Sequence, residues 1–361
     1  MLISSIFLKR FFLDNLVIEY RDPILGVILV VAVVFFISFF TYSYGIYKEK
    51  RARKDYRKLS LRFELGNLKE NDYVNLYKTY NLPFDTILLL ASSSLHKGDY
   101  NKAISIYLSL LEHVKDRVKK EELLELLGNT YFKGGFLQRS KDVFLKILKF
   151  SPRNKNVLRN LMLVNDKLKD YKKSLEICEA LNELNVDIAL DLEYYKGQII
   201  LNDSLLSIEK RASLLHEIYQ NSKNLERVYI SFLLQFDKKE FWKNIDSFNL
   251  KNIIDILWFQ RKEDLDFEAI KNNNFLSELY SAKNYYDLAS SSSDFNLDIL
   301  ILLNKNGKSS QASLNFEFIC KSCKHSHPFS ENRCPNCNNL LSMEVKHHLC
   351  KAFFETNQSL Q

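Results

Sequence analysis

An uncharged stretch near the N-terminus constrains this chain more than any other feature. From Ile24 to Tyr47 the sequence runs for 24 residues without a charged side chain, directly after Pro23. About 20 apolar residues span the hydrocarbon layer of a bilayer as a helix, and proline suits the first helical turn. A buried core helix of this length would show a polar face, and a cleavable signal has a shorter apolar region. The sequence therefore predicts a transmembrane helix over 24–47.

Basic residues are divided unevenly between the two sides of this segment. Residues 1–23 hold three basic and three acidic side chains, whereas residues 48–58 hold seven basic side chains against Glu49 and Asp55. The seven are Lys48, Lys50, Arg51, Arg53, Lys54, Arg57 and Lys58. Because basic flanks stay on the cytoplasmic side, we expect a single-pass protein with an outer leader at 1–23 and its C-terminal bulk in the cytoplasm. The basic juxtamembrane linker 48–58 is also expected to attract anionic membrane lipid.

The formal net charge of +7 is concentrated in that linker, which alone carries a balance of +5. The remaining residues mix acidic and basic side chains and show no one-sided basic helix, so we expect no nucleic acid partner. Only 9 glycines and 5 prolines occur in 361 residues, which argues against a turn-rich β architecture. The sequence predicts a mainly α fold.

A short motif recurs after the basic linker. Gly98-Asp99-Tyr100 is followed 37 residues later by Gly135 and, after 34 more, by the related Asp170-Tyr171. This spacing resembles the tetratricopeptide repeat, a helix-turn-helix unit of 34 residues. We expect a tetratricopeptide-type α-solenoid over 59–303, clearest over 84–188. The region 189–300 is expected to hold degenerate hairpins that continue the solenoid, with a separate helical bundle as the alternative.

A solenoid of this kind presents a concave groove lined by the first helix of each repeat. The register of the repeats places in the groove Ser92, His96, Asn129, Lys133, Arg159 and Lys167. This polar-to-basic surface suits a segment of another protein, although an ordinary solvated face is the alternative. The paired Lys/Asn clamp for a terminal carboxylate is not reproduced, so we do not expect chaperone-tail binding.

Two Cys-x-x-Cys pairs near the C-terminus form the strongest local motif. Cys320 and Cys323 precede Cys334 and Cys337, with ten residues between the pairs. Each pair forms a tight knuckle with inward thiolates, and two knuckles complete a tetrahedral four-sulfur site for zinc, with iron as a second possibility. Two disulfides or a redox dithiol are the alternatives, and a cytoplasmic location disfavours the disulfides. An electron-transfer iron centre would give a visible absorption band.

This motif defines a small four-cysteine metal-binding domain over 314–345, too short to fold without its ion. A linker at 304–313 is expected to precede it and a tail at 346–361 to follow it, so that loss of the metal would damage only this domain. The remaining candidate ligands lie nearby but are not needed once four thiolates fill the shell. They are His325, His327, His347, His348 and Cys350. Cys178 is expected to be a core residue.

The order of these parts resembles the lipopolysaccharide assembly protein B family of bacterial inner-membrane proteins. The most specific piece runs from Phe318 to Cys337: an aromatic residue, one residue, Cys-x-x-Cys, a spacer and Cys-Pro-x-Cys. The resemblance implies a rubredoxin-like domain with Cys320, Cys323, Cys334 and Cys337 as metal ligands. This sequence has Lys324 where the family has glycine.

The resemblance also implies a function. The family acts as an adaptor that couples a membrane-anchored ATP-dependent protease of the FtsH type to the lipid A deacetylase, and so tunes lipopolysaccharide synthesis. A tetratricopeptide scaffold that assembles an envelope or secretion complex without proteolysis is the alternative.

No catalytic motif is complete in this sequence. His216-Glu217 lacks the second histidine of a zinc protease helix, and Gly307-Lys308-Ser309 lacks the first glycine of a phosphate loop. We therefore expect a protein that is not an enzyme.

Overall fold

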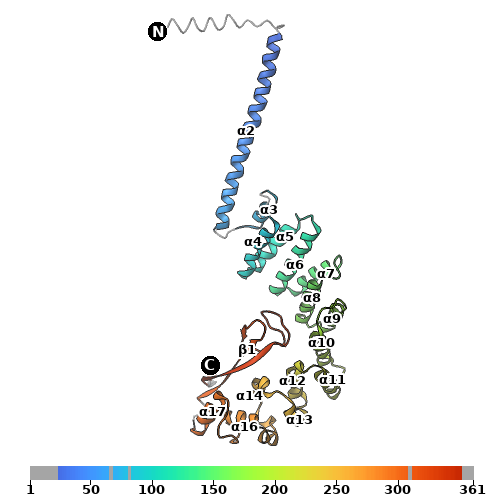
Figure 1. Cartoon of the computed structure of the whole chain (residues 1–361), viewed down its shortest axis with the longest axis vertical. Helices are drawn as coiled ribbons and strands as arrows, with labels where there is room; N and C mark the ends of the chain where they lie inside the picture. Colours follow the sequence, from blue (N-terminus) through green and yellow to red (C-terminus); the bar gives the residue numbers. More distant parts are fainter. Residues whose placement is uncertain (1–22, 65–67, 80–82, 308–310, 352–361) are drawn as a thin grey trace, which may run out of the picture. The chain divides into compact units, whose positions relative to one another are not determined.

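The computed structural model describes residues 23–64, 68–79, 83–307 and 311–351, and it is mainly α-helical with one small sheet (Figure 1). The chain divides into two compact units, Met1–His113 and Val114–Gln361.

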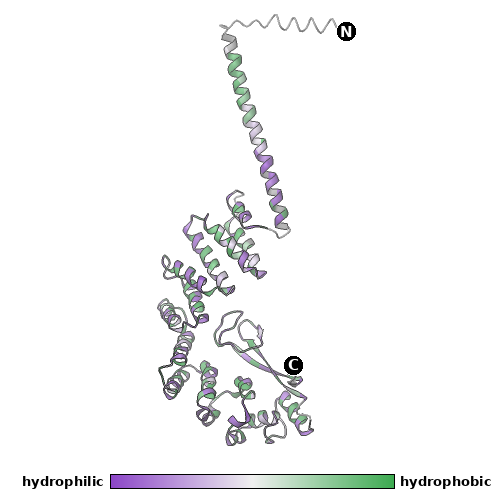
Figure 2. Cartoon of the chain, turned by 180° about the vertical axis from the view of Figure 1, so that it is seen from behind, coloured by the Kyte–Doolittle hydropathy of each residue, from purple (hydrophilic) through white to green (hydrophobic). Residues whose placement is uncertain are grey.

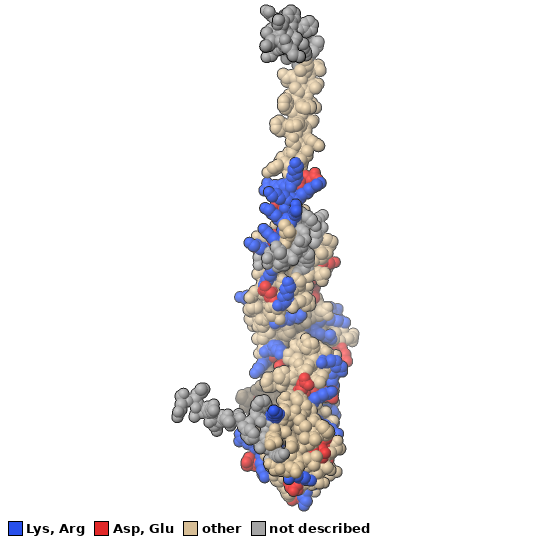
Figure 3. Space-filling model, turned by 90° about the vertical axis from the view of Figure 1, so that its left-hand side faces the viewer, with Lys and Arg blue, Asp and Glu red and all other residues tan. Residues whose placement is uncertain are grey.

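The first unit begins with one long helix, α2, which runs from Pro23 to Glu64. The predicted transmembrane segment and the basic linker are therefore parts of one continuous helix. The apolar half is followed by a hydrophilic half (Figure 2), and Lys and Arg side chains gather directly after the apolar half (Figure 3). Large apolar side chains here point outward, with Phe35 66% and Phe40 67% exposed. Among the described residues, α2 is the one helix long and apolar enough to cross a membrane.

Three further helices complete the described part of the first unit. They are α3 (Glu70–Lys78), α4 (Phe84–His96) and α5 (Tyr100–Leu111). Ile87 and Ala91 on α4 and Ala103 and Ile106 on α5 are completely buried. The recurrence of small and aliphatic residues at helical spacing explains why these two helices pack as a pair.

The second unit is a run of consecutive packed helices. Its first α-helices are α6 (Arg117–Lys133), α7 (Leu137–Leu148), α8 (Lys155–Lys167), α9 (Tyr171–Glu183), α10 (Ala189–Asn202), α11 (Ile208–Asn221) and α12 (Glu226–Phe236). Shorter ones follow: α13 (Lys238–Lys243), α14 (Ile254–Trp258), α15 (Phe267–Asn272), α16 (Asn274–Ala282) and α17 (Phe295–Lys305). Four 3-10 turns lie between them: η1 (Lys223–Leu225), η2 (Ile245–Ser247), η3 (Leu250–Ile253) and η4 (Lys262–Asp264). We refer to α6 through α17 as the helical array. Regions 114–188 and 189–300 belong to the same compact unit.

The repeat predicted from the sequence is visible in how three helices end. Gly98, Gly135 and Lys169 follow α4, α6 and α8, and all three have a positive φ of 78°, 78° and 59°. At each end the next residue donates its N–H to a carbonyl five residues back, as Asp170 N–H does to Asn165 O at 2.9 Å. This is the Schellman helix end, which glycine favours because it lacks a Cβ. The helical repeats are confirmed at these positions.

Small residues set the spacing within two helix pairs. A Cβ on Gly128 of α6 would lie 2.5 Å from the Phe144 ring of α7. Ser140 Oγ donates to Gly128 O at 2.8 Å, and Ser174 Oγ donates to Met162 O at 3.3 Å, in the equivalent place between α8 and α9. The paired helices approach this closely because a larger side chain is absent from each contact.

The C-terminal part forms a three-stranded antiparallel sheet in the order β2-β1-β3. Its strands are β1 (Ala312–Cys320), β2 (Ser326–His327) and β3 (Met343–Lys351). Strands β1 and β3 pair from Ala312↔Lys351 to Cys320↔Met343. Alternate β1 residues are buried, as expected for a strand with one face on a core.

The sheet shares its core with the helical array. Leu314, Phe316 and Phe318 of β1 belong to one hydrophobic cluster with side chains of α12 through α17, while Leu340 belongs to a second cluster with side chains of α8 through α11. In Figure 1 the helices from α8 to α17 follow a curve, and β1 lies on its inner side. The sheet is thus an integral part of the second unit.

The expected linker 304–313 overlaps regular structure at both ends. Helix α17 continues to Lys305, and β1 begins at Ala312, while residues 308–310 lie outside the described residues. Asn304 Nδ2 also donates to Ser281 O and Ala282 O, both at 2.8 Å. The start of the predicted linker is therefore tied to α16.

Candidate metal centre

Two matching turns hold the four cysteines. Cys320 ends β1, and the N–H of Lys324 donates to its carbonyl at 2.9 Å, which closes the first knuckle. In the second knuckle the N–H of Asn338 donates to Cys334 O at 2.8 Å. Lys324 and Asn338 have φ of 60° and 59°. The two Cys-x-x-Cys motifs therefore adopt the same left-handed turn.

The four sulfur atoms lie within 4.8 Å of one another. Cys320 Sγ is 3.6 Å from Cys337 Sγ, and Cys323 Sγ is 3.6 Å from Cys334 Sγ. A tetrahedral zinc site with Zn–S bonds of about 2.3 Å requires S···S separations of about 3.8 Å. All four are free cysteines. The cluster therefore suits a metal ion such as zinc.

The electrostatics of the cluster also favour a cation. Burial disfavours the Cys320 thiolate, but N–H groups of Cys323 and Ser322 and the Ser342 hydroxyl outweigh it and lower the pKa of Cys320 to about 5. Burial and the neighbouring thiols raise the pKa of Cys337 to about 12. Four thiolates at this separation repel one another, and a divalent cation removes that repulsion.

The other candidate ligands lie outside the sulfur cluster. His327 Nε2 is 3.5 Å from Cys334 Sγ, and His325 Nδ1 is 3.4 Å from the side-chain amide of Asn336. His347 pairs with Asp294 at 3.0 Å, where that carboxylate also caps α17. Cys350 donates to Ser313 O at 3.5 Å near the far end of the sheet. Cys178 is completely buried, as expected for a core residue.

Lys324 occupies a backbone conformation that favours glycine. A left-handed residue other than glycine costs roughly 1–2 kcal/mol, while the greater freedom of glycine in the unfolded chain offsets roughly 0.5–1 kcal/mol. We expect Lys324→Gly to raise the free energy of unfolding of the zinc-loaded chain by up to about 1.5 kcal/mol. Asn338→Gly is the matched control, with a smaller gain because asparagine tolerates this conformation. Thermal unfolding measures both; a loss of stability in Lys324→Gly would contradict the strained knuckle.

The second knuckle contributes a buried arginine that sequence reasoning missed. Arg333, directly before Cys334, is 7% exposed. Its Nε donates to Asp166 Oδ2 of α8 at 2.7 Å, and Nη2 donates to the Tyr195 hydroxyl of α10 at 2.8 Å and to Asp191. Burial opposes the charge, but Tyr195, Asp191 and Asp166 hold the pKa of Arg333 above its ordinary value. The partners are up to 167 residues away, and no local pattern in the sequence reveals such a contact.

Three neighbouring contacts extend this attachment. Asn332 Nδ2 donates to the Tyr194 hydroxyl at 3.3 Å, and Lys167 Nζ lies 3.6 Å from Glu331 Oε2. Leu340 is buried among side chains of α8 through α11. We call residues 330–341 the docking loop. It fastens the four-cysteine site to the first helices of successive pairs.

The predicted groove residues divide between the two units. Ser92 and His96 lie on α4 in the first unit, Asn129 and Lys133 on α6 and Arg159 and Lys167 on α8 in the second. Arg159 is exposed and lies two helical turns before Asp166, on the same face of α8. The ion pair of Lys167 with Glu331 brings this groove residue against the docking loop.

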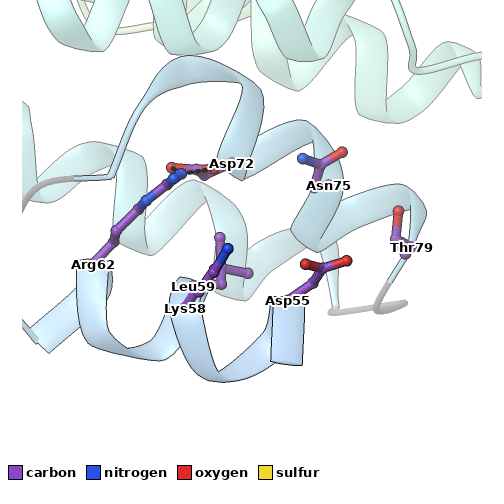
Figure 4. Close-up of a pocket in the computed structure, with 7 residues that line it drawn as sticks. All are labelled: Asp55, Lys58, Leu59, Arg62, Asp72, Asn75 and Thr79. Atoms are coloured by element: carbon purple, nitrogen blue, oxygen red, sulfur yellow. Dashed lines mark hydrogen bonds and ion pairs between the residues drawn. The ribbon is translucent and has the colours of Figure 1, made fainter. Parts of the chain in front are cut away.

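A hollow of about 370 Å³ lies in the first unit between the end of α2 and α3 (Figure 4). Arg62 Nη1 reaches across it to Asp72 Oδ1 at 2.9 Å and Oδ2 at 3.1 Å. Asp55 and Lys58 add one acidic and one basic side chain. The charges are balanced, so the hollow has no preference for an anion.

His216 and Gly307, the two residues considered for catalytic motifs, occupy structural positions. His216 Nδ1 lies 3.2 Å from the Tyr229 hydroxyl, and Gly307 follows α17 with a φ of 69°. Lys308 and Ser309 lie outside the described residues.

Comparison with known proteins assigns neither a family nor a function to this chain. A scan against protein-family models finds no model that matches the chain, and a search of curated proteins finds no match.

Proposed function

We propose that this chain is a membrane-anchored adaptor whose helical array binds other proteins at the cytoplasmic face of a bacterial inner membrane. The proposal rests on the continuity of an exposed apolar helix with a basic segment, followed along the described chain by packed helices. An apolar helix of this length with no buried side needs an apolar environment. Helical repeats supply extended surfaces for protein partners.

The basic half of α2 sets the proposed orientation. The seven basic residues of segment 48–58 follow the apolar half directly, where they contact anionic lipid head groups on the cytoplasmic side. This orientation places the four cysteines in a reducing compartment, where thiols remain available for metal.

The proposed ion at the four cysteines is structural zinc. The sulfurs provide four ligands, so the ion has no open position for a substrate. The residues that hold it are Cys320, Cys323, Cys334 and Cys337. Its role is to fix the two knuckles and, through them, the sheet and the docking loop.

The partners proposed by family resemblance are an FtsH-type membrane protease and the lipid A deacetylase. The arrangement of anchor, helical repeats and four-cysteine domain supports this proposal, because an adaptor needs a tether close to the protease and a surface for the substrate. The proposed outcome is regulated turnover of the deacetylase and therefore control of lipopolysaccharide synthesis.

Depletion of the chain tests this function in the cell that encodes it. We expect the half-life of the lipid A deacetylase to lengthen several-fold, because its delivery to the protease is lost. Pulse-chase measurement after depletion gives the half-life, with an unrelated protease substrate as the control. An unchanged half-life together with failure of a different envelope assembly would favour the non-proteolytic scaffold.

A further inference from the structure

The docking loop joins the metal site to the concave surface of the array. Arg333 provides the connection. It is the direct neighbour of Cys334, yet its side chain ends between α8 and α10.

On the array side, Nε and Nη2 of the Arg333 guanidinium donate three hydrogen bonds. It bonds Asp166, Asp191 and Tyr195, and it lies 5.9 Å and 5.6 Å from the ring centroids of Tyr194 and Tyr195. Two carboxylates with two aromatic rings form a pocket suited to the planar, charged guanidinium group. Removing this group leaves the two carboxylates partly or largely buried without their cation.

On the metal side, the same residue braces the second knuckle. Arg333 Nη1 donates to Asn338 O at 3.2 Å, and the backbone of Arg333 forms an antiparallel bridge with Leu340. Cys334 N–H donates to Asn339 O at 3.0 Å within the same turn. The shape of this turn places Cys334 and Cys337 in the cluster and directs Arg333 into the array.

We propose that metal binding at the four cysteines and insertion of Arg333 into the array are thermodynamically coupled, so that the ion closes the concave surface over α8 and α10 and its loss uncovers that surface. The bound ion holds the turn in the conformation that Arg333 needs, and the inserted Arg333 holds the turn in the conformation that the ion needs. Such coupling is reciprocal: each event strengthens the other by the same factor. Loss of the ion therefore exposes an acidic, aromatic pocket for a guanidinium group.

Zinc affinity measured on the full chain in detergent tests one direction of the coupling. Competition with a chromophoric chelator under reducing conditions gives the affinity of zinc for each variant. We expect Arg333→Met to bind zinc at least about fivefold more weakly, since coupling between sites is typically 5–150-fold. Lys321→Ala is the matched control, because Lys321 is exposed and is the direct neighbour of Cys320. It should retain the original affinity.

Hydrogen exchange tests the reverse direction. Stripping zinc from the unmodified chain should speed amide exchange in α8 and α10, while α6 and α7 keep their protection. If Arg333→Met does not fold, zinc affinity is measured instead on the triple variant Arg333→Met, Asp166→Asn, Asp191→Asn. In that variant the two carboxylates left without a cation are neutral amides. Unchanged zinc affinity in the folded Arg333 variant, or unchanged exchange in α8 and α10 after stripping, would overturn the coupling. Neither readout depends on which partner the array binds.

Discussion

Replacing Cys334 by serine is expected to release the metal and to destabilise more of the chain than the four-cysteine domain. Structural zinc contributes on the order of 10–16 kcal/mol in small peptides, so loss of a ligand should unfold residues 314–345. The loss of stability should then extend to α12 through α17, because Leu314, Phe316 and Phe318 share a core with these helices. Metal analysis, limited proteolysis and hydrogen exchange measure these effects, and α6 and α7 should remain protected.

Cys350→Ser provides the control for this prediction. Cys350 Sγ donates to Ser313 O at 3.5 Å and is not part of the sulfur cluster. The variant should keep a full equivalent of zinc. A Cys334→Ser chain that keeps a full equivalent and a protected C-terminus would contradict the four-cysteine assignment and require His325, His327 or Cys350 as a ligand.

Replacing Phe318 by alanine is expected to cost about 3–5 kcal/mol of unfolding free energy, the usual loss for a buried phenylalanine. Phe318 is 6% exposed, and the guanidinium carbon of Arg227 on α12 lies 5.7 Å from its ring centroid. The cavity left by the missing ring would therefore destabilise both the sheet and the helices that pack against it. Chemical denaturation followed by circular dichroism should show the helical transition at lower denaturant.

Phe329 offers a matched control in the same domain. It is 76% exposed, so Phe329→Ala should change the unfolding free energy by no more than about 0.5 kcal/mol. Equal effects of the two substitutions would contradict a core shared between β1 and the helices.

The features that sequence predicted well are those encoded by neighbouring residues. The cysteine spacing predicted the cluster because each knuckle needs only five consecutive residues. The uncharged run predicted the long helix, and the motif aligned at Gly98, Gly135 and Asp170 coincides with three equivalent helix ends at residues 98, 135 and 169. Each of these signals depends on local geometry.

The contacts that sequence missed join residues far apart in the chain. Nothing near Arg333 indicates that Asp166 and Asp191 are its partners, since surface arginines and aspartates are common in any sequence. Leu340 likewise looks like one apolar residue in a polar loop, although it is buried among α8 through α11. For this reason the expectation that metal loss would damage only the four-cysteine domain conflicts with the shared core.

Some segment boundaries in the structure also differ from the predicted ones, for physical reasons. The linker predicted at 48–58 is helical because its lysines and arginines favour helices, so α2 continues from the apolar stretch without a break. After residue 188 the small-residue motif fades, although α10 and α11 still form a regular pair; short helices and 3-10 turns become frequent only after α11. Their core is aromatic and aliphatic rather than set by close backbone approach.

Photocrosslinking inside the cell tests the adaptor proposal most directly. A photoreactive residue at Arg159, exposed on α8, samples the concave face, while one at Glu176, exposed on α9, serves as the control. We expect a crosslink between the Arg159 position and the lipid A deacetylase that is absent from the Glu176 position. The absence of the deacetylase at Arg159, or equal capture of it at both positions, would contradict the proposal that this face binds it.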